Sequence, residues 1–89
     1  MKASNQFILR TIADENLLIP VGEAALSVKG LIALSESGAL LFQTLKKSCE
    51  KADLISALMA EYDVSEKIAS QDVEAFLGQM RQLGMLVED

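Results

Sequence analysis

The hydrophobic pattern of this chain changes its period near Ser35, and that change constrains the fold more than any other feature. Before Ser35, short apolar and β-branched runs are separated by turn residues, as strands are. After Ser35, apolar residues recur at helical spacing, most clearly over residues 51–62. The pattern therefore predicts an α+β fold in which the strands come first and the helices follow.

The part before Ser35 predicts three short strands. Residues 7–12 and 17–21 are apolar and flank the turn-forming residues 14–16, so they are expected to pair as an antiparallel hairpin. A looser connection over residues 22–29 leads to a third strand over residues 30–34. These strands are apolar on both faces, which predicts a sheet that is partly covered.

The part after Ser35 predicts three helices. Ser35 is a suitable N-cap for the first, and Glu36 places a negative charge in its first turn. The second helix is expected over residues 51–62. The third is expected to begin at Ser65, its N-cap, and to end before Gly84, where a C′ glycine terminates helices.

Together these elements predict one domain over residues 1–89, with an ordered core over about residues 7–87. The expected architecture is winged helix-turn-helix-like, with a three-stranded antiparallel sheet followed by three helices. The apolar tail at residues 85–87 is expected to pack beneath the sheet.

The residue inventory argues against catalysis. The chain has no histidine and a single cysteine, Cys49, so the common triads, zinc sites and iron–sulfur sites are not expected. Three lysines near Cys49 in sequence would lower the pKa of a reactive thiol, but a partly buried, incidental thiol is the favoured interpretation. We expect no enzyme activity, no catalytic residue, no cofactor and no metal.

The charge distribution argues against nucleic-acid partners. The net charge of −5 lies entirely in residues 35–89, which carry five basic and ten acidic side chains. A DNA-recognition helix needs cationic contacts, and residues 65–83 contain three acidic and two basic side chains. The sequence also lacks a run long enough to span a membrane and a signal peptide, so a cytoplasmic protein without a membrane partner is expected.

The predicted third strand has no strand after it in the sequence. An exposed strand edge can pair with an extended peptide, which gains main-chain hydrogen bonds while alternate side chains enter pockets. The same edge could instead be covered by the chain's own loop or by a second copy of the protein. From the residues alone these alternatives remain open.

Several stretches, in order and spacing, resemble the PqqD family from about Phe7 to Val87. Each stretch is short. The most specific part of the resemblance is the Tyr62–Asp63–Val64 segment together with the stretches of the last helix that follow it. Ser35 stands where such proteins commonly have Asn, and Ser caps a helix about as well. The stretches are Leu9–Arg10, Leu18–Pro20, Gly30–Ser35, Gly38–Leu45, Ala52–Leu58, Glu61–Val64, Asp72–Leu77 and Leu83–Val87.

The resemblance implies a peptide chaperone, a recognition element for ribosomally made and post-translationally modified peptides. Such proteins hold the leader of a precursor peptide and present its core to a modifying enzyme, often a radical S-adenosylmethionine enzyme. In that family the leader adds as a strand to the third strand, against the third helix. Carried onto this chain, the strand contacts are expected from Gly30, Leu31, Ile32, Ala33 and Leu34.

On a helical wheel of the third helix, four residues form one flank beside the apolar stripe and are the expected helix side of the peptide site: Ile68, Asp72, Ala75 and Gln79. Ala75 is small enough to admit a peptide side chain, Ile68 would offer an apolar wall, and Asp72 or Gln79 could form hydrogen bonds. The alternative function is a winged-helix scaffold or regulator that acts through homo-oligomerisation at the same edge, with a homodimer as one possible form. DNA binding is the third and least favoured hypothesis.

Overall fold

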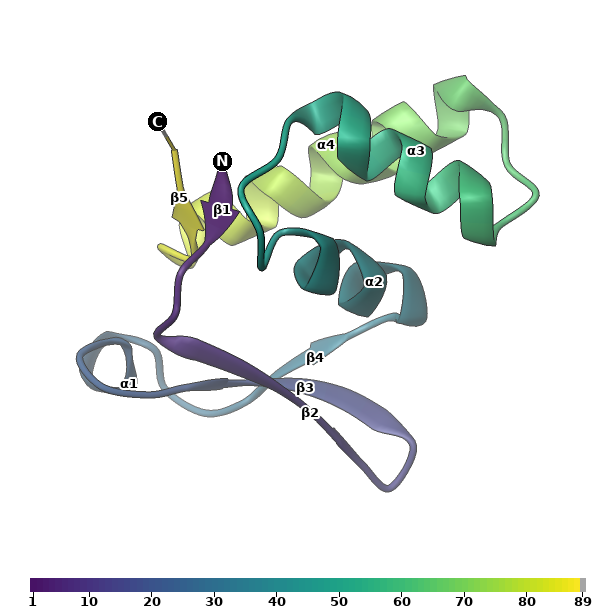
Figure 1. Cartoon of the computed structure of the whole chain (residues 1–89). Coiled ribbons are helices and arrows are strands. Elements are labelled where there is room, and N and C mark those ends of the chain that lie inside the picture. The colour runs from purple at the N-terminus through teal and green to yellow at the C-terminus, as the bar shows by residue number, and fades with distance from the viewer. Residues whose placement is uncertain (89) are drawn as a thin grey trace.

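The computed structural model describes residues 1–88, which form five strands and four helices (Figure 1). In chain order the elements are β1 (Lys2–Ala3), β2 (Phe7–Ile12), β3 (Glu15–Pro20), α1 (Ala24–Ser27), β4 (Ile32–Leu34), α2 (Glu36–Thr44), α3 (Lys51–Glu61), α4 (Glu66–Gln82) and β5 (Leu86–Val87).

The main sheet has three antiparallel strands in the order β2-β3-β4, so the predicted α+β fold with a three-stranded sheet followed by helices is confirmed. Leu18 on β3 lies opposite Leu9 on β2 and Ile32 on β4. Strand β4 lies at one edge of this sheet. It begins at Ile32, two residues later than expected, since Gly30 has a φ of +84° that departs from extended backbone.

The hairpin turn lies at Ala13 and Asp14 rather than at residues 14–16. Both turn residues have positive φ, 51° and 65°, as the two central residues of a type I′ turn do. Glu15 and Asn16 instead belong to β3, where they pair with Ile12 and Thr11. The polar character of these residues suggested a turn, but the two-residue loop that matches strand twist needs only Ala13 and Asp14.

Serine caps begin two of the three long helices, as the sequence predicted. The Ser35 hydroxyl oxygen accepts a hydrogen bond from the Gly38 N–H at 3.1 Å, at the start of α2. The Ser65 hydroxyl oxygen accepts one from the Ile68 N–H at 3.2 Å, at the start of α4. These caps satisfy backbone donors that a helix N-terminus leaves unpaired, and the first places α2 directly after β4.

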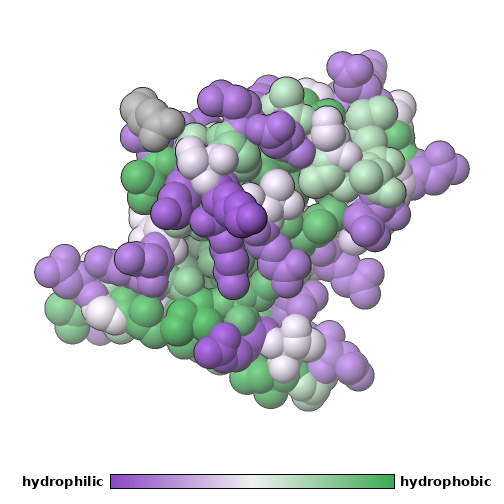
Figure 2. Space-filling view, in the orientation of Figure 1, coloured by the Kyte–Doolittle hydropathy of each residue, from purple (hydrophilic) through white to green (hydrophobic). Residues whose placement is uncertain are grey.

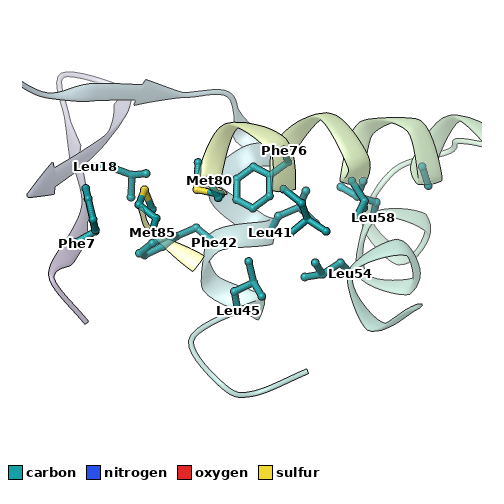
Figure 3. Close-up of a cluster of buried hydrophobic side chains, with 13 residues drawn as sticks. Phe7, Leu18, Leu41, Phe42, Leu45, Leu54, Leu58, Phe76, Met80 and Met85 are labelled. Atoms are coloured by element: carbon teal, nitrogen blue, oxygen red, sulfur yellow. The ribbon is translucent and has the colours of Figure 1, made fainter. Parts of the chain in front are cut away.

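One hydrophobic core joins the sheet to the helices (Figure 3). Leu18 reaches it from the sheet, Phe42 from α2, Leu54 from α3 and Met80 from α4. Its buried residues are Phe7, Leu18, Leu41, Phe42, Leu45, Leu54, Leu58, Ala69, Val73, Phe76, Leu77, Met80 and Met85. Because the core holds α2 and α4 on one side of β4, it fixes the distance between the strand edge and α4.

Of the apolar tail at residues 85–87, Met85 packs in the core together with Leu18 of the main sheet, as the sequence suggested, whereas the last two residues do not join that sheet (Figure 3). Leu86 and Val87 instead pair with Ala3 and Lys2 as a separate two-stranded sheet, β1-β5. Gly84 terminates α4 with a φ of +70°, and the N–H of Met85 donates to the carbonyl of Met80 at 2.9 Å, as in a Schellman ending. This small sheet therefore brings the start of the chain beside the segment that follows α4.

The face of the main sheet away from the helices is mostly apolar as well, with Arg10 as its charged exception. Ile8 lies opposite Ile19, and Arg10 lies opposite Leu17, while none of these side chains belongs to the core. Figure 2 shows hydrophobic residues gathered on the side of the molecule where this sheet lies. None of the helices within residues 1–88 is long and apolar enough to cross a lipid bilayer.

Candidate functional site

A pocket of about 290 Å³ lies between β4 and α4. We call it the β4–α4 pocket. Its lining comes from β4, from the start of α2 and from one flank of α4: Ala33, Leu34, Ser35, Ser37, Gly38, Leu41, Asp72, Ala75, Phe76 and Gln79. Small-molecule sites span roughly 300–1,000 Å³, so this pocket suits one or two side chains better than a larger ligand.

The apolar part of this pocket belongs to the core. Leu41 and Phe76 line it and are also buried core residues, so the pocket rests on rigid packing. At Gly38 an added Cβ would lie 3.3 Å from the Ser35 hydroxyl oxygen and 3.5 Å from the Leu34 Cβ. The glycine thus lets the first turn of α2 approach the end of β4 closely.

The structure brings five of the nine predicted site residues to this pocket. Ala33 and Leu34 line it from β4, and Asp72, Ala75 and Gln79 line it from α4.

The other four predicted residues lie outside the pocket. Gly30 and Leu31 precede β4, and the Leu31 side chain is 56% exposed. Ile32 packs against the core instead. Ile68, 45% exposed, lies one helical turn before Asp72 on the same flank of α4.

Sequence reasoning missed the part of the lining that comes from α2. Ser35, Ser37 and Gly38 join the pocket because α2 begins directly after β4 and turns its N-terminal end toward α4. The sequence feature that accompanies this part of the lining is the N-cap Ser35 followed by Gly38 in the first turn of α2. By itself that pattern indicates only the start of a helix.

A second pocket, of about 440 Å³, adjoins the first, since Ser35, Ser37 and Asp72 line both. We call it the Tyr62 pocket. Its remaining lining residues are Glu36, Tyr62 and Val64. We refer to the two adjoining pockets together as the groove; it starts beside β4 and reaches Ser35 and Glu36, which follow the C-terminal end of that strand.

The charged residues of the groove are both acidic. Asp72 lines both pockets and Glu36 lines the Tyr62 pocket, whereas no lysine or arginine lines either one among residues 1–88. The neutral polar lining comes from Ser35, Ser37 and Gln79. The groove therefore combines an apolar floor with hydrogen-bonding groups and negative charge.

One edge of β4 is open in the part of the chain that the structure describes. The strand pairs with β3 on one side, and residues 1–88 place no strand on its other side. An open edge presents backbone N–H and C=O groups that an extended chain can pair with. A chain added there would lie beside the β4–α4 pocket, into which its alternate side chains could point.

Cys49 lies outside this groove, in the connection between α2 and α3. The pKa of its thiol is raised, first by partial burial and then by the negative charge of Asp53, whereas the amino terminus acts in the opposite direction. The nearby lysines do not lower this pKa, contrary to the alternative that their spacing suggested. The thiol donates a weak hydrogen bond to the Thr44 carbonyl at 3.9 Å.

Comparison with protein families gives one match over most of the chain. The family model of "Coenzyme PQQ synthesis protein D (PqqD)" matches residues 22–86. This range contains β4, α2, α3 and α4, and with them both pockets. No curated protein sequence matches this chain significantly.

Two solved structures share the fold over nearly the whole chain. One is TbiB1 in complex with the TbiA(β) leader peptide, with a TM-score of 0.76, 22% sequence identity and complete coverage of both chains. The other is lasso peptide synthetase B1 complexed with the leader peptide, with a TM-score of 0.75, 21% identity and coverage of 98% of this chain and 96% of that one. At these identities the likeness establishes the fold.

Proposed function

We propose, because this chain belongs to the coenzyme PQQ synthesis protein D (PqqD) family, that it binds the leader segment of a ribosomally made precursor peptide. The two solved structures that share its fold are described as complexes with leader peptides. In this proposal the protein is a non-catalytic recognition element. The pathway it serves would make a modified peptide or a peptide-derived cofactor.

The observation that carries this proposal is the open edge of β4 next to the β4–α4 pocket. A leader in extended conformation would add to β4 as a fourth strand. Main-chain hydrogen bonds would supply affinity for any sequence, and the pocket would select the side chains that face α4. Because a disordered leader loses conformational entropy on binding, we expect affinity of roughly micromolar strength.

The contacts follow from this arrangement. We propose that Gly30, Leu31, Ile32, Ala33 and Leu34 form the strand side of the site, and that Ile68, Asp72, Ala75 and Gln79 form the helix side. Ala33, Leu34, Asp72, Ala75 and Gln79 line the pocket directly. Gly30 and Leu31 would contact the leader as it enters or leaves the paired segment, and Ile68 would contact a residue beyond the pocket.

The bound leader needs a second partner, the enzyme that modifies the core of the precursor. We propose that this chain presents the precursor to such an enzyme, with a radical S-adenosylmethionine enzyme as the first candidate. Since precursor peptides are made on ribosomes, both partners would meet this protein in the cytoplasm.

Calorimetric titration with synthetic leader segments tests the proposal. The peptides would come from short open reading frames next to the gene, and scrambled versions of each would serve as controls. We expect saturable binding of one leader at a stoichiometry of one to one. No heat with any leader, together with a concentration-independent dimer in light scattering, would instead support a homodimer that covers β4.

A further inference from the structure

Asp72 and Glu36 are negative charges without a partner in the described part of the chain. Both are exposed, and neither forms an ion pair or a side-chain hydrogen bond within residues 1–88. Two other acidic residues are paired: Glu74 with Lys51 and Glu88 with Arg81. The basic side chains of these two pairs are engaged away from the groove, and its negative charge is not neutralised from within.

The Tyr62 pocket also offers an apolar surface beside these carboxylates. Tyr62 and Val64 line it and are half-buried against the core. Lysine and arginine side chains match such a surface, because their alkyl stems pack on apolar groups while the charged end meets the carboxylates. A tyrosine ring adds a favourable interaction with a cation.

We infer that the Tyr62 pocket takes a lysine or arginine side chain of the bound leader. The inference rests on the proposed function, since it requires a peptide on β4. The pocket adjoins the β4–α4 pocket at Ser35 and Asp72, beyond the C-terminal end of β4. The basic residue of the leader therefore lies just outside the segment that pairs with β4, before or after it according to the direction in which the leader runs. Its spacing along the leader from the residues in the β4–α4 pocket is fixed.

The two carboxylates contribute unequally. Glu36 lies in the first turn of α2, where the positive end of the helix dipole already balances part of its charge. Asp72 lies in the middle of α4 and has no such compensation. Replacing Asp72 is therefore expected to weaken binding of a basic side chain more than replacing Glu36.

A displayed library of random dodecapeptides tests the inference even before the natural leader is identified. It would be selected in parallel against the immobilised protein and against the Asp72→Asn/Glu36→Gln variant. We expect peptides selected by the protein to carry lysine or arginine at one fixed position relative to their apolar residues. The variant is expected to select the same apolar pattern without the basic residue.

Calorimetry on a selected peptide then gives the size of the effect. Asp72→Asn is expected to weaken binding about 3- to 5-fold and Glu36→Gln about 2-fold, as for exposed charged pairs. Glu61→Gln is the matched control, because Glu61 is exposed, forms no ion pair within residues 1–88 and lines neither pocket. Asp72→Lys should restore affinity for a peptide in which glutamate replaces the basic residue.

The outcomes separate this inference from the proposed function. Selected peptides without a fixed basic residue, or equal selection by the protein and its variant, would overturn the inference and leave the leader-binding function standing. Basic residues scattered over all positions would also overturn it, because that pattern reports only the negative net charge. Failure to enrich any peptide above uncoated resin would contradict the proposed function, and the inference with it.

Discussion

Ala33 on β4 and Ala75 on α4 line the same pocket from different elements, one from the strand edge and one from the helix. Both side chains are single methyl groups and both are exposed. Neither residue belongs to the buried core, and both border the space that a peptide side chain would occupy. Ala75 can be enlarged to close the pocket while the packed interior stays intact, whereas the side chain of Ala33 lies with its partner Leu17 on the outer face of the sheet.

Filling the pocket should block the leader. Ala75→Leu adds a branched side chain beside Phe76 and Gln79, and we expect leader affinity to fall at least about tenfold because the peptide side chain loses its place. Thermal unfolding should change little, since Ala75 is exposed and leucine is a good helix former.

Gln71→Leu is the matched control for this substitution. Gln71 is exposed on α4 and lines neither pocket. The Gln71→Leu variant should bind the leader with unchanged affinity by calorimetry. Equal loss of binding in both variants would contradict a site at the β4–α4 pocket.

Strand addition predicts a period of two along the leader. Methylation of a backbone nitrogen removes a donor, and in an added strand only every second N–H points toward β4. We expect N-methyl groups at alternate leader positions to weaken binding about tenfold, while the intervening positions tolerate them. A scan by fluorescence anisotropy measures this. Uniform sensitivity, or a period of three to four residues, would indicate a helical leader instead.

The type I′ turn predicts a stabilising substitution. Ala13 adopts a left-handed conformation, which costs an ordinary L-residue roughly 1–2 kcal/mol, whereas asparagine and glycine adopt it readily. Ala13→Asn/Asp14→Gly should therefore raise the free energy of unfolding by about 0.5–1 kcal/mol. For a domain of this size that corresponds to a few degrees in Tm, measured by circular dichroism.

Ala13→Val provides the opposite test of the turn, because a β-branched residue tolerates positive φ poorly. It should lower Tm. A loop without positive φ would show no gain from the asparagine–glycine pair and no loss from valine.

The ion pair between Lys51 and Glu74 joins α3 to α4 and makes part of the stability depend on pH. The Lys51 side chain lowers the pKa of Glu74 from its ordinary value of 4.5, chiefly by a hydrogen bond and then by its charge. A lowered pKa in the folded protein means that this stabilisation is present above the ordinary value and is lost as pH falls through the folded value.

Glu74→Gln should accordingly lower Tm slightly at neutral pH and leave it unchanged in strong acid. The measurement is the difference in Tm between the two proteins over a pH series, with Glu61→Gln as a control that lacks the ion pair. A difference that persists below the folded pKa would mean that Glu74 acts by something other than its charge.

The sequence was sufficient for β2, the three long helices and the edge position of β4 because each has a local cause, whereas the short helix α1 lies where only a loose connection was expected. The apolar run before Asp14 predicts β2, and the serine at each helix start predicts where α2 and α4 begin. The edge position of β4 follows from its place as the last strand before the helices. Likewise, the helical wheel placed Asp72, Ala75 and Gln79 on one flank, and all three line one pocket.

What could not be predicted depends on contacts between distant parts of the chain. Strands β1 and β5 have two residues each, too few to show a period, and their pairing depends on Ala3 lying opposite Leu86, which is distant in the sequence. The shared lining by Glu36, Tyr62 and Asp72 comes from three separate segments. Their proximity is set by how α2, α3 and α4 pack, which no local pattern encodes.

The most direct measurement of the central claim is a nuclear magnetic resonance titration of the ¹⁵N-labelled protein with the leader that binds in calorimetry. The account predicts saturable shifts concentrated on the amides of β4 and on residues 72–79 of α4, with new protection from hydrogen exchange along β4. Ala75→Leu should abolish these shifts at the same peptide concentration. Saturable shifts confined to another surface, with the β4 amides unchanged, would contradict leader binding at this edge.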